Sequence, residues 1–389
     1  MLLALLLSNP VMAGDYIQSF EDPIELPLAG GWPRVIPDDD GVNWHLLWAM
    51  GGQYSMIPMT SDLWAEDYGR KDLTDGTVSH MLKDHAFTAC PDGGYLHIAS
   101  ANVISPNDSA YAFRYDDNFD LVSWSTLEEG VDSQAHNDMP LACSPIFTAT
   151  SFGGIGVGAT IASRYFYLDE NAQVVDTQDT VNLPRTGGSA LKVEPETNSI
   201  LLVEMSSLPL DVPGEMWITR LDLDLNLLNV YRAQVLPDGH NGHWPQGILR
   251  IGDFYMVAYI GWPDDTWDGH NGDMWVAVFD MDWNLLETQQ VSNNTPTNPG
   301  MRPGLVRRGA IVLATYDKNT TPHIHELQID LEAFGIEEGD TGNWDTGDTG
   351  GDSDKGCGSC TTQGSPHSGW LGLAALLALL RRRYSDSSS

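Results

Sequence analysis

The chain has 389 residues, 42% apolar and 19% charged, which is enough to bury a large core or two domains. Asp and Glu outnumber Lys and Arg by 54 to 19, and the net charge of −35 repels phosphate backbones and anionic lipid, which excludes nucleic-acid binding. The 39 glycines, 22 prolines and 13 tryptophans indicate many turns and a sheet-rich body rather than a helical bundle.

The N-terminus has the pattern of an export signal. An apolar run over residues 2–7 is followed by Val11-Met12-Ala13, whose small or apolar groups suit signal peptidase. We expect residues 1–13 to be a signal peptide that is cleaved after Ala13, and a buried N-terminal strand is the alternative.

Residues 14–335 contain a repeat of about 53 residues. One row of the repeat is an apolar strand, an Asp-containing turn and a second apolar strand, which is the pattern of a hairpin. The aspartates of this row are Asp62, Asp116, Asp169, Asp222, Asp280 and Asp330. A second row lies about 30 residues earlier, and its members begin at Trp32, His85, Met139, Ser189, Trp244 and Arg302.

The repeat predicts an all-β fold, a β-propeller with six four-stranded blades. Radial repetition of such blades leaves only short, protected sheet edges. The sixth copy lacks its last strand, so we expect residues near 19–27 to supply the outer strand and close the ring. A β-solenoid is the structural alternative.

Two cysteines occupy equivalent places in the second and third copies. Cys90 and Cys143 would end neighbouring innermost strands, and export permits their oxidation to a disulfide. The alternative is a pair of buried thiols that pack as small apolar groups.

The loops that lead into the innermost strands of a propeller surround one mouth of its central channel. In this sequence the candidate ligand-binding residues at that mouth are Arg34, His85, Asp138, His243, Trp244 and Arg302. Arg34 and Arg302 would be neighbours in a closed ring, where two guanidinium groups can hold a carboxylate. His85, Asp138 and His243 could ligate a metal or carry a proton. The alternative is that the Trp-Pro and Arg-Pro pairs belong only to the repeat.

Motifs for metal binding and catalysis are weak. The Asp-rich turns at residues 222–226 and 280–284 lack the Gly and the distant Glu of an EF-hand, so ordinary turn chemistry is expected. The Gly-x-Ser-x-Gly and His-Glu-x-x-His motifs are absent from the sequence. We therefore name no catalytic residue and no cofactor, and we leave open Ca²⁺ or another divalent cation.

Beyond the repeat the chain becomes polar and acidic. Residues 336–355 repeat Asp-Thr-Gly, cannot bury enough apolar area to fold, and are expected to be a linker. An apolar run at residues 370–380 follows, which as a helix would span about 16 Å and is short for a hydrocarbon core of about 30 Å.

The last segment, residues 356–389, combines this apolar run with Cys357, Cys360 and the cluster Arg381, Arg382, Arg383. That order resembles the MYXO-CTERM protein-sorting tail of myxobacteria and their relatives. The resemblance implies recognition by a sorting protease of the cell envelope, removal of the apolar helix and display on the cell surface. It also implies that the Cys pair marks the processing site; a redox or zinc half-site is the alternative.

These observations favour an exported, monomeric propeller, displayed on the cell surface or released, that binds a glycan or a protein without catalysis. One alternative is a secreted metal-dependent hydrolase or lactonase-like enzyme with its site at the channel mouth. Another is a passive coat or adhesion scaffold.

Overall fold

In the computed structural model the described residues are 14–28, 31–37, 44–50, 53–59, 70–73, 81–90, 93–102, 108–131, 141–143, 148–153, 162–181, 189–205, 213–263, 272–293, 300–318 and 321–336. They all belong to one compact unit, Met1–Gly351. The signal peptide, most of the linker and the sorting tail lie outside the described residues, and the predictions for them stay untested. Among the residues described, no helix is long and apolar enough to span a membrane.

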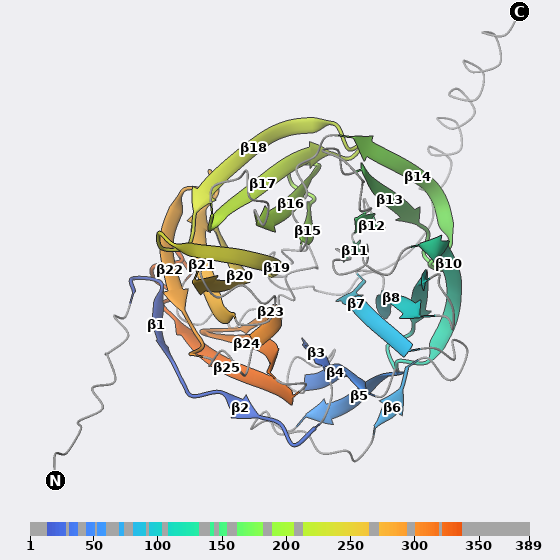
Figure 1. Ribbon diagram of the computed structural model, residues 1–389, viewed down its shortest axis with the longest axis horizontal. Helices are drawn as coiled ribbons and strands as arrows, with labels where there is room; N and C mark the ends of the chain where they lie inside the picture. Colours follow the sequence, from blue (N-terminus) through green and yellow to red (C-terminus); the bar gives the residue numbers. More distant parts are fainter. Residues whose placement is uncertain are drawn as a thin grey trace, which may run out of the picture. The chain divides into compact units, whose positions relative to one another are not determined.

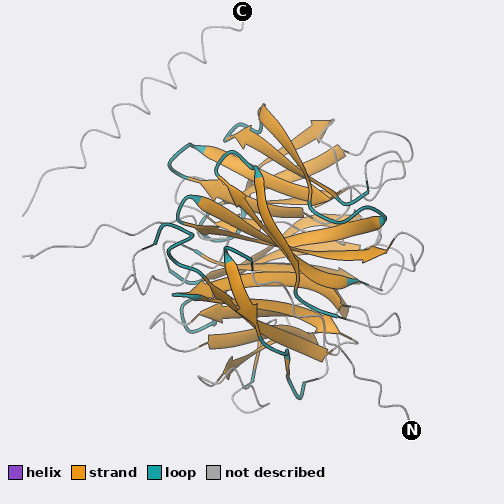
Figure 2. Ribbon diagram, turned by 90° about the vertical axis from the view of Figure 1, so that its left-hand side faces the viewer, coloured by secondary structure: helices purple, strands orange, loops and turns teal. Residues whose placement is uncertain are grey.

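The described strands form six antiparallel sheets around a common centre (Figures 1 and 2). Blade 1 contains β3 (Gly31–Pro37), β4 (Trp44–Met50), β5 (Gln53–Met59) and β6 (Lys71–Asp72). Blade 2 contains β7 (Met81–Ala89), β8 (Tyr95–Asn102), β9 (Asp108–Tyr115) and β10 (Leu121–Val131). Blade 3 contains β11 (Leu141–Cys143), β12 (Thr148–Gly153), β13 (Ala162–Leu168) and β14 (Val174–Val181).

The second half of the ring continues the same pattern. Blade 4 contains β15 (Ser189–Glu194), β16 (Ser199–Met205), β17 (Glu215–Asp222) and β18 (Leu227–Gln234). Blade 5 contains β19 (His240–Ile251), β20 (Phe254–Pro263), β21 (Asp273–Asp280) and β22 (Leu285–Gln290). The closing blade joins β23 (Gly300–Arg308), β24 (Ile311–Lys318) and β25 (Thr321–Ile329) to the N-terminal strands β1 (Ile17–Phe20) and β2 (Ile24–Glu25).

The predicted all-β propeller is confirmed. The innermost strands β3, β7, β11, β15, β19 and β23 each contact the next, and β23 contacts β3, so the ring is closed. Four strands per blade, as predicted, holds for blades 1 to 5. The closing blade has five strands, because β1 and β2 pair with different parts of β25 and together fill the outer position. This confirms that the N-terminal segment supplies the outer strand.

The hydrophobic core lies between the blades rather than in the centre of the ring. Among the described residues, each pair of neighbouring blades shares one cluster of buried apolar side chains. Trp262 lies in β20, is 6% exposed and belongs to the cluster between blade 5 and the closing blade.

The Asp turn that joins the third and fourth strands is the same in blades 2 to 5. The carboxylates of Asp116, Asp169, Asp222 and Asp280 each accept hydrogen bonds of 2.8–3.0 Å from the backbone N–H groups two and four residues later. These bonds engage Oδ1 of each carboxylate in holding its own turn, which agrees with the turn interpretation. Asp330 caps a different turn, and Asp62 lies outside the described residues.

Each Asp turn places an apolar residue in the left-handed region. Phe119, Ala172, Leu225 and Trp283 have φ between 57° and 62°, and none is more than 5% exposed. Left-handed backbone costs a residue with a Cβ roughly 1–2 kcal/mol. The cost is offset because each side chain enters the cluster that its own blade shares with the preceding blade.

Side chains of the outer strands join blades 1, 2 and 5 to a turn or strand of the next blade. Lys71 of β6 donates to the carbonyl of Asn118 at 2.8 Å, and Ser123 of β10 donates to the carbonyl of Asn171 at 2.7 Å. Gln289 of β22 donates to the carbonyl of Ile17 in β1 at 3.1 Å. The ring is therefore held by apolar clusters inside and by polar contacts at its rim.

We predict that Trp283→Ala destabilises the propeller by about 3–5 kcal/mol, the usual cost of truncating a buried Trp. The Trp283 ring is 2% exposed and stacks on Tyr255 with a centroid distance of 4.3 Å. Leu227→Ala is the control, because Leu227 lies a few residues away and is 56% exposed, so its loss should change stability by less than about 0.5 kcal/mol. Urea unfolding of the two variants measures the difference, and equal stabilities would contradict the prediction.

A buried histidine makes the fold sensitive to acid. His97 of β8 is surrounded by aromatic rings, with centroid distances of 4.7 Å to Tyr54 and 5.5 Å to Phe87. Burial disfavours the charged imidazolium and lowers the pKa of His97 to about 3. Burial also lowers the pKa values of His323 and His325 in β25.

We predict that stability is full above pH 6.5 and falls as the pH drops below it. The folded pKa of His97 is below its ordinary value of 6.5, so the unfolded chain binds the proton first and unfolding is favoured in acid. This residue contributes up to about 1.4 kcal/mol per pH unit. Urea unfolding between pH 5 and 7 measures the slope, and His97→Phe should reduce it while leaving the part due to His323 and His325. An unchanged slope would show that His97 takes no part.

Candidate functional site

Four innermost strands carry a β-bulge at the same level of the channel. The pairing shifts between Gly31 and Arg34 in β3, Leu82 and His85 in β7, His243 and Gly247 in β19, and Met301 and Gly304 in β23. Three of these bulges contain a buried proline: Pro33, Pro245 or Pro303. Proline lacks the N–H that a regular ladder needs, so it fits where the ladder is interrupted. The Trp-Pro and Arg-Pro pairs therefore mark the positions of bulges in the innermost strands.

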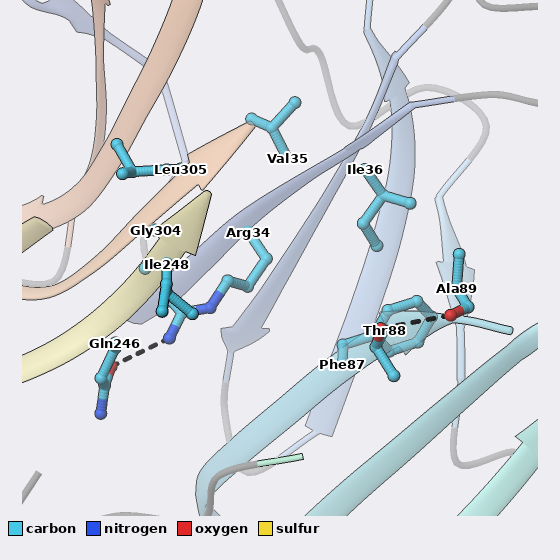
Figure 3. Close-up of a pocket in the computed structure, with 11 residues that line it drawn as sticks. Arg34, Val35, Ile36, Phe87, Thr88, Ala89, Gln246, Ile248, Gly304 and Leu305 are labelled. Atoms are coloured by element: carbon cyan, nitrogen blue, oxygen red, sulfur yellow. Dashed lines mark hydrogen bonds between the residues drawn. The ribbon is translucent and has the colours of Figure 1, made fainter. Parts of the chain in front are cut away.

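A cavity of about 50 Å³ lies between these four strands, just beyond the bulges. Its polar lining comes from Arg34, Thr88 and Gln246, and Figure 3 shows these side chains with their neighbours. Phe87, Ile248 and other apolar side chains form the remaining wall. The volume accommodates a few water molecules or one small group of a ligand, not a whole sugar.

Arg34 is the charged group of this cavity, and its guanidinium is held from two sides. Nη2 donates to Oε1 of Gln246 in β19 at 2.9 Å, and Nη1 donates to the carbonyl of Pro33 at 3.1 Å. Figure 3 shows the Arg34 side chain extending from β3 toward Gln246, with Gly304 beside it. Both side chains are half-buried, so the guanidinium is positioned before any ligand arrives.

Gly304 makes the reach of Arg34 possible. A Cβ at this position would lie 2.9 Å from Oγ1 of Thr315 and 3.3 Å from Cδ of Arg34, both closer than ordinary contact. Because Gly304 has no side chain, the Arg34 side chain can pass over β23 and reach Gln246 in β19. Arg34 thereby links three consecutive innermost strands at the channel mouth.

The backbone brings most of the predicted site residues to one level. Arg34 and His85 immediately follow their bulges, His243 precedes one, and Trp244 and Arg302 lie within theirs. The structure describes the side chain of Arg34, whereas for the other four it describes the backbone only. Asp138 lies outside the described residues. The predicted pairing of Arg34 and Arg302 around a carboxylate is supported only by the contact between β3 and β23.

The sequence analysis left three contributors to this site without a role. Gln246, Gly304 and Thr88 lie in the second row of the repeat, in the copies that begin at Trp244, Arg302 and His85. Gly304 follows Arg302-Pro303, at a repeat position where the other copies have a larger residue. That difference in size was the sequence signal for a close contact at Gly304. Nothing in the sequence indicates that an arginine from one blade bonds to a glutamine two blades away.

Metal ligation finds no support at the described positions. Among them, no group of three or more His, Cys, Asp or Glu side chains is placed to hold an ion. The pKa of Asp222 lies below its usual range, and hydrogen bonds from Asn226 are the main cause. The Asp222 carboxylate is thus stabilised by its own turn without a cation.

The cysteine prediction gains a geometric basis but stays a prediction. Cys90 directly follows β7, Cys143 ends β11, and these two innermost strands contact each other. Cys90 is buried, at 8% exposure, and the Cys143 side chain lies outside the described part of the chain.

We predict that Gly304→Ala destabilises the fold by about 1–3 kcal/mol, because the new methyl group overpacks the crossing of Arg34 and Thr315. Part of the cost comes from Arg34, so the double variant Gly304→Ala/Arg34→Ala should be more stable than the sum of the single changes by about 0.5 kcal/mol or more. Urea unfolding of the four chains gives this coupling. Strict additivity would show that the two residues do not touch in solution.

No protein-family model and no curated protein sequence matches this chain. Among solved structures it is similar to a subtype N10 neuraminidase-like protein of A/little yellow-shouldered bat/Guatemala, with 13% identity, a TM-score of 0.48, and coverage of 81% of this chain and 99% of that one. A structure described as the Dos1 propeller has 11% identity and a TM-score of 0.37 over 75% of this chain and 67% of that one. An apocarotenoid oxygenase mutant from Synechocystis has 11% identity and a TM-score of 0.43 over 80% and 70%. These values support no inference about function, which has to come from the residues of the channel.

Proposed function

We propose that this protein is an exported, surface-displayed propeller that binds a carboxylate-bearing ligand at its channel mouth without catalysis. The observation that carries the proposal is the Arg34 guanidinium, which lines the cavity and is held in place by Gln246 and the Pro33 carbonyl. Guanidinium groups bind carboxylates by paired, charge-assisted hydrogen bonds. A guanidinium positioned in advance loses little conformational entropy on binding.

An acidic glycan is the ligand class that fits this site best. The net charge of −35 repels polyanions, so a suitable ligand carries one or a few carboxylates on an otherwise neutral frame. The cavity of about 50 Å³ accepts the carboxylate but not a sugar ring, which would stay at the mouth beside the backbone of Trp244. Aromatic side chains at such a position offer an apolar face with a polar edge. A protein ligand could present the same carboxylate on an Asp or Glu side chain, and it is the alternative to a glycan.

Two sequence features support the location. The signal-peptide pattern that ends at Ala13 and the tail with Cys357, Cys360 and the arginine cluster 381–383 are both typical of exported, surface-attached proteins. A ligand site at the mouth of a propeller tethered by an acidic linker would face the outside of the cell.

We predict that Arg34→Ala weakens binding of a uronic-acid oligosaccharide at least tenfold. Arg34→Lys should restore it only in part, because an ammonium cannot form the paired bonds of a guanidinium. Arg250→Ala is the matched control: Arg250 lies at the far end of β19 and pairs with Glu196 at 3.0 Å, away from the cavity. Calorimetric titration with the oligosaccharide and with its neutral, carboxyl-reduced form measures the effect.

Three results would overturn the proposal. Equal binding of both oligosaccharides would remove the role of the carboxylate, and an unchanged affinity of Arg34→Ala would remove the site. Hydrolysis of the oligosaccharide during the titration would establish an enzyme. In that case a melting temperature that rises with Ca²⁺ or Zn²⁺ in the full chain, but not in Asp138→Ala, would identify the metal-dependent hydrolase.

A further inference from the structure

The first described residue, Gly14, lies against a carboxylate of another blade. A Cβ on residue 14 would overlap the carboxyl group of Glu287, which belongs to β22 of blade 5. The backbone N–H of Tyr16 donates to Oε2 of the same carboxylate at 2.8 Å. The Glu287 carboxylate therefore lies where the N-terminal segment meets blade 5. Figure 1 shows this segment beside β22.

Glu287 is half-buried, and the described groups around it do not neutralise it. Its other neighbours include Gln289, whose amide donates to Oε1 of Glu287 and also to the carbonyl of Ile17. Within the described ranges no lysine or arginine forms an ion pair with Glu287. A half-buried carboxylate that receives only neutral donors is an unfavourable arrangement in a protein with a net charge of −35.

Signal-peptide cleavage would supply the missing cation at this place. Hydrolysis of the Ala13–Gly14 peptide bond by a signal peptidase consumes one water molecule, leaves a carboxylate on Ala13 and gives Gly14 a free α-amino group. That group has an ordinary pKa of about 7.7–8.0, so it is protonated at neutral pH. The Gly14 nitrogen already donates to the carbonyl of Ile17 at 3.1 Å, and an ammonium has two further donors for Glu287.

We propose that the mature N-terminus is a structural group of the propeller: the α-ammonium of Gly14, produced by cleavage after Ala13, forms an ion pair with Glu287 that locks the closing blade to blade 5. The inference rests on the proposed export but not on the proposed ligand. It assigns a reason to two residues. Gly14 has no side chain that would collide with the carboxylate. Glu287 supplies the negative charge that pairs with an α-ammonium only when the chain begins at residue 14.

The proposed ion pair would stabilise the contact between the N-terminal segment and the end of the ring. The same corner contains Tyr16, which packs against Phe254 of blade 5 at 5.4 Å and against Phe334 at 5.1 Å. The Tyr16 carbonyl accepts from the backbone N–H of Asp330 at 2.9 Å. Loss of the ion pair would therefore loosen the seam between the first and last parts of the chain rather than an isolated loop.

The test compares chains that extend to Ser389 and differ only at this corner. One begins at Gly14 and one at Ala13, and each is made with and without Glu287→Gln, which keeps the size and an acceptor for the Tyr16 N–H. At pH 7 the Gly14 chain should melt about 2–4 °C higher than the Ala13 chain. Glu287→Gln should remove that advantage and affect the Ala13 chain less. Glu332→Gln, a change of an exposed glutamate in the closing blade, is the control and should change neither chain.

The pH dependence gives a second readout. An ion pair raises the folded pKa of the α-amino group above its unfolded value, so its contribution is complete below pH 8 and is lost as the pH rises toward 10. The other titratable groups of this corner are Asp15, Tyr16, Glu287 and Asp330, and all four are present in both chains, so the difference between the chains isolates the α-amino group. The advantage of the Gly14 chain should therefore vanish as the pH approaches 10.

Equal melting temperatures of the Gly14 and Ala13 chains at pH 7, or an equal loss in both on Glu287→Gln, would overturn the ion pair. The processing step is tested separately, by intact-mass analysis of the chain exported with residues 1–13 attached. A mature mass that begins at Gly14 supports the proposal, and any other N-terminus overturns it. Neither measurement involves a ligand, so failure here leaves the channel-mouth proposal to its own test.

Discussion

Closure of the ring is the constraint on which the rest of this structure depends. The last repeat ends after β25, so its sheet is complete only when β1 and β2 pair with β25 from the opposite end of the chain. A sheet edge left open would expose unpaired backbone groups, and the cluster that contains Leu26, Leu313 and Ile324 would face water. The propeller is therefore one cooperative ring whose two ends must meet, and the Gly14–Glu287 corner lies at that seam.

Two residues of each Asp turn stabilise the repeat in different ways. An aspartate accepts two backbone N–H groups, which fixes the turn, and the residue three positions later adopts left-handed backbone to bury an apolar side chain. Leu225 and Trp283 show why this position is not glycine: the apolar area that enters the core between blades outweighs the backbone cost. In Asp222 and Asp280, whose turns resemble calcium loops in sequence, both carboxylate oxygens accept hydrogen bonds within the turn.

The channel mouth is built from the irregular parts of an otherwise regular fold. Bulges at Pro33, Pro245 and Pro303 interrupt the innermost ladders at one level, and Gly304 opens a path across β23. Arg34 uses that path to reach Gln246 and so places a positive charge in the channel of a strongly acidic protein. This positioned charge is the observation on which the proposal of ligand binding rests.

The sequence by itself determined the strand order, the propeller architecture and the N-terminal closure, because a period of about 53 residues with its Asp turns is a local, repeated pattern. It also placed Arg34, His85, His243, Trp244 and Arg302 at one level, since equivalent repeat positions occupy equivalent places in a ring. Only the tertiary structure decided that Trp262 is a core residue, that Arg34 bonds to Gln246, and that Gly14 rests on Glu287. These contacts join residues more than 200 positions apart in the last two cases, and they depend on how neighbouring blades pack, which no local pattern encodes.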